Sequence, residues 1–178
     1  DMVNRVFQTG KQAVSGCTNS WGDPLSWNCI GITAHYSFGK TTGALPDGRL
    51  AYTPLSDGSL SAFPGTDKRG PTAVIKSASK VDILEAMGTL FNMKFHPGAM
   101  KGREGLQKFI SFIKTYFDLG GYHIQFNVVD RETLLDARAH PEKYKDLVIR
   151  IAGFSMFWVD VPPDVQDEII RRTEYGCF

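Results

Sequence analysis

Residues 148–155 read Val-Ile-Arg-Ile-Ala-Gly-Phe-Ser, and this stretch decides how the fold is interpreted. Its apolar residues are typical of a buried strand, and Gly153 interrupts the run. Residues 156–159, Met-Phe-Trp-Val, continue the strand pattern, and residues 164–173 follow with an acidic-then-basic helical pattern behind two prolines. The order expected here is therefore a strand, a glycine loop, a second strand and a helix.

Upstream of this stretch, residues 122–129 are expected to form a strand because apolar and polar residues alternate there. We expect the polar face to be solvated, as on most half-exposed strands, and not to point into a barrel. Asp130 is placed to cap a helix that runs to Ala139 and ends at Pro141. The apolar and polar faces of the strand consist of Ile124, Phe126 and Val128 and of His123, Gln125 and Asn127, respectively.

Two helices are expected before that strand. The clearer one has a continuous apolar stripe and is stopped by Gly120 and Gly121. The other covers residues 72–93 and ends within residues 92–97, because the residue before Pro97 is disfavoured in a helix. The two stripes consist of Leu106, Phe109, Ile110, Ile113, Tyr116 and Phe117 and of Val74, Val81, Leu84, Met87, Leu90 and Phe91.

The first 71 residues show less periodicity. Residues 1–30 hold two turn-rich segments and are expected to form a loop. Residues 30–38 alternate partly, as a half-buried strand would. Residues 39–71 are so dense in turn formers that we expect a long functional or wrapping loop. Together with the downstream elements, this order predicts an α/β fold.

Composition excludes several classes of protein. The chain has 178 residues, of which 42% are hydrophobic, enough for one globular core. Its 20 basic residues nearly balance its 19 acidic ones and are scattered, which argues against nucleic-acid binding, and no apolar run is long enough to cross a bilayer. Cys17, Cys29 and Cys177 have unrelated spacings that indicate neither a disulfide framework nor a metal site. We expect a cytoplasmic protein without bound metal.

Two segments carry a resemblance to a known family. Arg-Ile-Ala-Gly-Phe-Ser at residues 150–155 and Val-Gln-Asp-Glu-Ile-Ile-Arg-Arg-Thr at residues 165–173 resemble the C-terminal signature of glycyl radical enzymes, the family that includes pyruvate formate-lyase. The Gly- and Pro-rich segments at 42–49, 54–58 and 70–74 are similar to the region that precedes this signature. The resemblance covers nearly the whole chain but only the C-terminal portion of the family's length.

The resemblance implies a fold and its division. The chain would form the C-terminal part of a ten-stranded β/α barrel of the glycyl radical enzyme type. Residues 1–70 would hold a barrel strand and long loops, and residues 71–178 the glycyl radical domain.

A glycine suits a backbone radical for a chemical reason. The radical is stabilised between an amide nitrogen that donates electrons and a carbonyl that withdraws them, provided that the α-carbon becomes planar, and a side chain would clash in that form. By resemblance, Gly153 stores the radical. Because water and oxygen must be excluded, we expect apolar surroundings from Ile149, Ile151, Phe154, Phe157 and Trp158.

The resemblance also implies partners for this chain. A separate activating enzyme, which uses S-adenosylmethionine and an iron–sulfur cluster, would remove one hydrogen from Gly153, so this chain would bind no cofactor itself. The glycyl radical would then produce a thiyl radical on a cysteine. The surroundings of Cys17 do not match the family's cysteine loop, so we expect that cysteine in the remainder of the catalytic subunit. The complete enzyme is expected to be a homodimer.

Two arginines belong to the segments that carry the resemblance: Arg150 lies three residues before Gly153, and Arg172 lies in residues 165–173. Arg150 and Arg172 are suited to paired hydrogen bonds with carboxylates, either structural or on a substrate, and the structural role is favoured. Arg172 also matches a position that approaches the active site in some family members, so it is a second candidate catalytic residue after Gly153. His35 and His96 are interpreted as turn or packing histidines.

The resemblance implies a lyase or transferase that cleaves a small organic acid or alcohol by anaerobic radical chemistry. Ala-Gly-Phe at 152–154 differs from the Ser-Gly-Tyr typical of pyruvate formate-lyase. We favour an arylacetate decarboxylase or another C–C lyase. Alternatives in the family are a dehydratase, a C–N or C–S lyase and a fumarate-adding synthase. A further alternative is a non-catalytic, stand-alone glycyl radical subunit that replaces the damaged C-terminus of a partner enzyme. The last alternative is a binding or structural domain with a coincidental glycine turn, which would form no radical.

Overall fold

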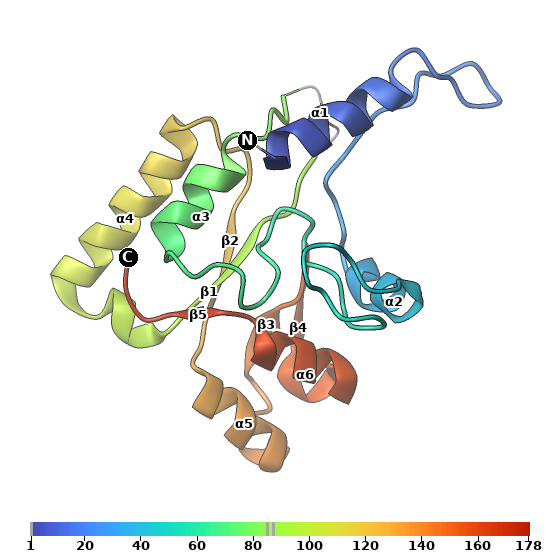
Figure 1. Cartoon of the computed structure of the whole chain (residues 1–178). Helices are drawn as coiled ribbons and strands as arrows, with labels where there is room; N and C mark the ends of the chain where they lie inside the picture. The colour runs from blue at the N-terminus through green and yellow to red at the C-terminus, as the bar shows by residue number, and fades with distance from the viewer. Residues whose placement is uncertain (1, 85, 87) are drawn as a thin grey trace.

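A computed structural model describes residues 2–84, 86 and 88–178 and has a mixed α/β architecture (Figure 1). Its central sheet is parallel, with the order β2 (Gln125–Val128), β1 (Asn92–Phe95) and β5 (Glu174–Tyr175). Phe95 of β1 is in register with Val128 on one side and Tyr175 on the other. Two segments that lie 30 residues or more away from β1 in the sequence therefore flank it in space.

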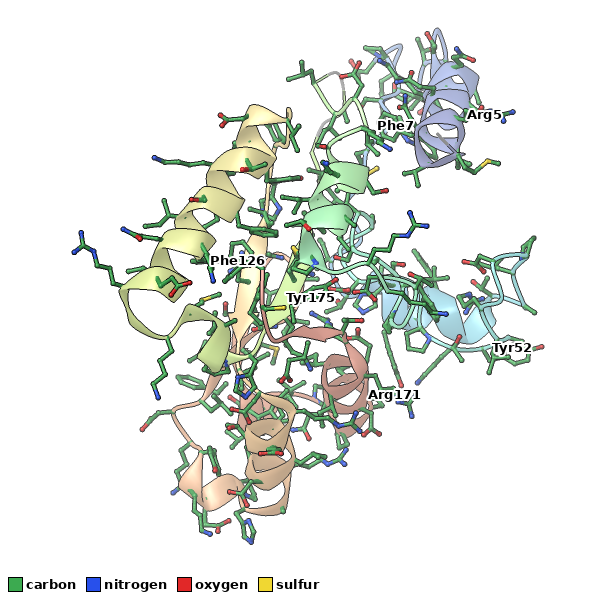
Figure 2. The ribbon with its side chains drawn as sticks, turned by 60° about the vertical axis from the view of Figure 1, so that its left-hand side comes forward. Arg5, Phe7, Tyr52, Phe126, Arg171 and Tyr175 are labelled. Carbon is green, nitrogen blue, oxygen red and sulfur yellow. The ribbon has the colours of Figure 1, made fainter. Side chains whose placement is uncertain are left out.

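Helices α3 (Pro71–Ala78) and α4 (Gly102–Asp118) pack against one face of this sheet (Figure 1). The core between them is aromatic: the ring of Phe95 contacts other rings at centroid distances between 4.7 and 6.2 Å. Phe126 and Tyr175, labelled in Figure 2, reach this core from the two outer strands. Rings at these distances exclude water and add a geometric preference to the packing. The partners of Phe95 are Phe109, Phe112, Phe126, Tyr175 and Phe178.

A second core lies under an antiparallel hairpin of β3 (Val148–Arg150) and β4 (Ser155–Phe157). Helices α5 (Arg131–Ala139) and α6 (Pro163–Arg171) pack beside it (Figure 1). Its most buried side chains include Leu134, Ile149, Ile151, Trp158 and Ile169. Among the described residues, short 3₁₀ turns lie at Pro97–Met100, Pro141–Lys143 and Trp158–Asp160.

Several expected elements are confirmed. The apolar stripe before Gly120 forms α4, and the alternating stretch after it forms β2. Asp130 caps α5, because its side chain accepts a hydrogen bond of 2.6 Å from the amide of Thr133. The expected strand, glycine loop, strand and helix correspond to β3, β4 and α6. None of the described helices is both long and apolar enough to cross a membrane.

The expectation that residues 1–30 form a loop is wrong for the first half, where α1 (Met2–Val14) is a helix. Phe7 is buried on one face of α1, and its ring meets that of Trp27 edge-on at 6.5 Å. Gly10 allows this contact, because a Cβ there would lie 2.7 Å from a Trp27 ring atom. The helix is thus stabilised by a tryptophan from the following turn-rich segment, which local periodicity does not reveal.

The strand expected at residues 30–38 is also wrong, since α2 (Ala34–Thr41) is a helix. The apolar residues that suggested alternation are not on one buried face: Ile32 is 49% exposed and Phe38 is 62% exposed. Instead, α2 buries His35 and Gly39. The loop expected over residues 39–71 is confirmed for residues 42–70, which contain no helix and no ladder-forming strand, whereas residues 39–41 belong to α2 and Pro71 begins α3.

The helix expected over residues 72–93 is too long, because α3 ends at Ala78. Leu90 forms an isolated bridge to Ser59, and residues 92–95, expected to end the helix, are the central strand β1. Met87, which contributed to the expected stripe, lies outside the described residues. Phe91 and Phe95 are fully buried, and a short apolar run buried on both faces cannot be told from a helix by its spacing.

Candidate functional site

Gly153 lies at the tip of the β3–β4 hairpin. The amide of Ile151 donates to the carbonyl of Phe154 at 2.9 Å, which encloses Ala152 and Gly153 in a two-residue loop. Gly153 has a φ of +81°, a conformation that favours glycine strongly over any residue with a side chain. The backbone conformation alone therefore selects glycine at this position.

Leu90 adds a steric reason. A Cβ at Gly153 would lie 3.3 Å from Cδ1 of Leu90. The backbone of Leu90 is held on both sides, by the carbonyl of Cys29 at 2.9 Å and the amide of Leu60 at 3.2 Å. A side chain at position 153 would therefore require the Leu90 methyl group to shift by a few tenths of an ångström, and one of the two α-hydrogens of Gly153 points at that methyl group.

The apolar surroundings expected for Gly153 are present on one side only. Ile149, Ile151 and Trp158 are buried beneath the hairpin, with at most 1% of each exposed. Phe154 and Phe157 were expected to cover the loop as well, but they are 37% and 48% exposed, and Gly153 is itself exposed. This part of the expectation is wrong for the chain by itself, because the core that packs against the hairpin contains Ile149, Ile151 and Trp158 and neither Phe154 nor Phe157.

Arg150 is the last residue of β3, and its side chain bonds across the hairpin next to the loop. Its Nη2 donates to the carbonyl oxygen of Gly153 at 3.2 Å, and its Nη1 donates to Oγ of Ser155 at 3.3 Å. Its Nε donates to Oε1 of Gln125 at 2.5 Å. The guanidinium thus connects both strands of the hairpin and the loop to the central sheet.

The polar face of β2 holds the hairpin in place. Asn127 donates to the carbonyl of Arg150 at 2.7 Å and accepts from its amide at 2.8 Å. Gln125 donates to the side chain of Asn92 on β1. Only 9% of Gln125 and 7% of Asn127 is exposed, so the solvated face expected for this strand is wrong. The hairpin supplies the hydrogen-bond partners that solvent would otherwise provide.

Arg172 lies beneath the same loop. Its Nε and Nη2 donate to the two carboxylate oxygens of Glu168 at 2.9 and 2.7 Å. Its Nη1 lies 3.1 Å from Oδ2 of Asp57 and donates to the carbonyl of Ile151 at 2.8 Å. All three charged side chains are less than 10% exposed. The arginine therefore binds two carboxylates and a carbonyl two residues before Gly153.

His35 extends this cluster to α2. Its Nδ1 lies 3.0 Å from the carbonyl of Ile32 and its Nε2 lies 3.4 Å from Oε2 of Glu168. A neutral imidazole has one N–H, whereas both ring nitrogens here face oxygens, so the geometry suits the imidazolium. Burial lowers the pKa of His35, but the Glu168 carboxylate and the Ile32 carbonyl together raise it above its ordinary value. The cluster then contains two cations and two carboxylates.

The two carboxylates respond differently to this environment. Burial favours the neutral form of both, yet Arg172 and His35 hold the pKa of Glu168 well below its ordinary range. Burial and the charge of Glu168 raise the pKa of Asp57, although Arg172 opposes them. Arg172 donates to both carboxylate oxygens of Glu168. Glu168 is therefore the carboxylate that stays ionised.

Sequence reasoning missed most of this cluster. Asp57 was treated only as a turn residue, Glu168 only as part of a helical pattern, and His35 as a packing histidine. The spacing of Glu168 and Arg172, which are four residues apart at the C-terminal end of α6, was a local signal for their pairing. No local signal connects them to Asp57 or His35. Within the described part of the chain, no group of His, Cys, Asp or Glu side chains is arranged to hold a metal ion.

The comparisons with known proteins agree with this geometry. A family model described as "Glycine radical" matches residues 56–159, which include the hairpin and part of the ion cluster. The chain belongs to the glycyl radical family. This confirms the resemblance seen in the sequence.

Relatives of this glycyl radical chain are considerably longer. It is 51% identical over 178 residues to indoleacetate decarboxylase of Tractidigestivibacter scatoligenes. This match covers 100% of the chain and 20% of the decarboxylase. It is 45% identical over 155 residues to the 4-hydroxyphenylacetate decarboxylase glycyl radical subunit of Clostridium scatologenes, covering 87% of the chain and 17% of the relative.

A solved structure, the glycerol-bound B12-independent glycerol dehydratase from Clostridium butyricum, superposes with a TM-score of 0.91 at 42% identity. The match covers 97% of this chain and 22% of the dehydratase chain. The chain thus spans about a fifth of the length of the relatives that it matches.

Proposed function

We propose that this chain is the part of a glycyl radical enzyme in which Gly153 stores a backbone radical. One observation carries the proposal: inside the family match, Gly153 is the hairpin-tip glycine whose φ of +81° and close approach to Leu90 disfavour a side chain. The carbonyl of Gly153 and that of Ile151 are both held by arginines. A loop fixed in this way keeps its shape when one α-hydrogen is removed.

Activation would remove one hydrogen atom from the α-carbon of Gly153. A separate activating enzyme, which by family resemblance uses S-adenosylmethionine and an iron–sulfur cluster, would have to reach Gly153 from the side of the hairpin that is exposed in this chain, before the remainder of the subunit covers it. This chain then supplies the glycine and its supports and no cofactor site of its own.

The remainder of the subunit would complete the site. Phe154 and Phe157, both partly exposed here, would be covered by the rest of a ten-stranded β/α barrel, which excludes water and oxygen from the radical. A cysteine from that remainder would give its thiol hydrogen to the α-carbon of Gly153 and become a thiyl radical. The thiyl radical would take a hydrogen atom from the substrate, and the complete enzyme would be a homodimer in the cytoplasm.

Arg172 has a supporting role in this proposal. Its donors are directed to Glu168, Asp57 and the carbonyl of Ile151. A guanidinium engaged in this way positions the loop, and substrate contact would require breaking a buried ion pair. We therefore assign Arg172 to positioning Gly153.

For the substrate we favour an arylacetate, with decarboxylation as the reaction. Two similar relatives are named as decarboxylases of indoleacetate and 4-hydroxyphenylacetate. The superposition on a glycerol dehydratase keeps dehydration as the alternative. Side chains that contact the substrate would lie largely in the remainder of the subunit, since function is determined by the site and not by the fold.

Electron paramagnetic resonance under anaerobic conditions tests this function. The intact protein is incubated with a radical S-adenosylmethionine activating enzyme, then exposed to air and analysed by mass spectrometry. We expect a doublet signal and oxygen-dependent cleavage at Gly153, both absent in Gly153→Ala. Gly48→Ala is the matched control, because Gly48 also has a positive φ, of +94°, but lies in a distant turn.

Cleavage that persists in Gly153→Ala would show that the radical is elsewhere. Absence of the doublet in the wild-type protein would refute the storage role. Release of CO₂ from indoleacetate or 4-hydroxyphenylacetate, compared with dehydration of glycerol, then decides the reaction class.

A further inference from the structure

The strongest unassigned feature of the site is the contact between the Arg150 guanidinium and the Gly153 carbonyl. Resting on the proposed function, we propose that Arg150 stabilises the radical form of Gly153 by donating a charged hydrogen bond to its carbonyl oxygen. Arg150 thereby acts on the electronic structure of the radical, in addition to joining the strands of the hairpin.

The donor is fixed in place before any radical forms. Arg150 and Ser155 face each other across the hairpin, so Nη1 and Nη2 are directed at the loop. Nε is held by Gln125, which is 9% exposed and is itself bound to Asn92 on the central strand. A donor held by buried neighbours needs little reorganisation when charge develops on its acceptor.

The charge of Arg150 is not neutralised by a contact. Its three acceptors are an amide, a hydroxyl and a carbonyl, and among the described residues no carboxylate lies within 4.0 Å of its guanidinium nitrogens. The neighbouring His123 responds to this cation, because burial lowers its pKa and the charge of Arg150 lowers it further. Arg172, by contrast, is paired with Asp57 and Glu168.

The radical makes the Gly153 oxygen a better acceptor. When the α-carbon loses a hydrogen atom and becomes planar, the amide nitrogen donates electron density and the carbonyl withdraws it, so negative charge on the oxygen grows. A cationic donor at this oxygen therefore binds the radical form more strongly than the closed-shell form. Only such a differential interaction shifts the balance between the two forms, as in an oxyanion hole.

The test compares radicals in the activated, intact protein with glycine labelled with ¹³C at the carbonyl carbon. Electron paramagnetic resonance gives the ¹³C hyperfine splitting and the anaerobic decay rate. We expect Arg150→Gln to form a doublet that decays about threefold or more faster and has an altered splitting, since charged hydrogen bonds are roughly twice as strong as neutral ones. Arg103→Gln, on the exposed side of α4, is the matched control and should behave as wild type.

A second variant separates charge from hydrogen bonding. Gln125→Glu keeps the side-chain length and the acceptor for Nε of Arg150, and it loses the amide donor to Asn92; the new carboxylate neutralises the cation while Nη2 still faces the carbonyl of Gly153. We expect its splitting and decay to change in the same direction as in Arg150→Gln. Hydrogen exchange over residues 148–158 shows whether Arg150→Gln is folded. If it is not, Gln125→Glu alone tests whether the charge of Arg150 stabilises the radical.

The two proposals fail differently. No doublet in the wild type refutes radical storage at Gly153. A wild-type doublet with unchanged splitting and decay in a folded Arg150→Gln or Gln125→Glu variant refutes only the role of Arg150 and leaves it as a structural link in the hairpin.

Discussion

Replacing Arg172 with methionine tests whether the buried ion cluster holds the glycine loop. Methionine has a similar length and no charge, so the change removes the donors to Glu168, Asp57 and the Ile151 carbonyl. Asp57 and Glu168 would remain in the core at 3% and 6% exposure, with His35 as their nearest cation. The carbonyl of Ile151 would retain only the side chain of Asn92, at 3.4 Å.

The expected magnitude follows from the loss of one partner in a buried ion pair. Such changes cost about 3–5 kcal/mol of folding free energy. For a chain of this size, about 2–4 °C of melting temperature is lost per kcal/mol, so we expect a decrease of roughly 6–20 °C. The difference should shrink in acid, because the pKa of Glu168 is depressed in the folded state. Its contribution is present above its unfolded pKa and is lost as the pH falls through the folded pKa.

Hydrogen exchange measured by mass spectrometry shows where this loss occurs. At about 1.4 kcal/mol per tenfold change, we expect exchange in the 148–158 hairpin to accelerate about a hundredfold or more. Arg171→Met is the control, because Arg171 is the exposed neighbour on α6, labelled in Figure 2. If the two variants exchange alike in the hairpin, the cluster does not hold the loop and the positioning role of Arg172 is refuted.

Two further predictions concern the first part of the chain. Burial and the charge of Arg172 lower the pKa of His35 in the folded state, but Glu168 and Ile32 raise it by more, so the folded pKa lies above the unfolded pKa. The stabilisation that His35 contributes is therefore complete below the unfolded pKa and is lost as the pH rises through the folded pKa. Unfolding free energies from about pH 5 to about pH 9 should therefore decline more in the wild type than in His35→Gln, and parallel curves would contradict this. Gly10→Ala should release Trp27 despite the better helix propensity of alanine, because the new Cβ would lie 2.7 Å from the indole. A red shift in tryptophan fluorescence is expected, and an unchanged spectrum would show that α1 accommodates the methyl group.

The elements predicted correctly are those whose signals are local. α4 has its apolar stripe and its glycine stop, and α5 has its Asp130 cap. Alternation over a few residues identified β2, and a glycine between two apolar runs identified the hairpin. Each signal lies within about one turn or one pleat of the backbone, so neighbours in the sequence suffice to generate it.

The elements predicted wrongly depend on contacts between distant segments. β1 was assigned to a helix because a strand buried on both faces loses its alternation, and its partners β2 and β5 lie far along the chain. The polar face of β2 was assigned to solvent because the hairpin that covers it begins about 20 residues later. Helix α1 depends on Trp27.

The sequence by itself determined that Gly153 lies between two strands and that its surroundings resemble a glycyl radical signature, because both are properties of contiguous residues. Only the tertiary structure decided how the glycine is held. Asp57, Glu168 and Arg172 meet beneath the loop although more than a hundred residues separate the first from the others, and Arg150 reaches the Gly153 carbonyl from a position fixed by Gln125. Folding brings these charges out of water together, and their pairing is specific because a buried charge left without a partner would be strongly unfavourable.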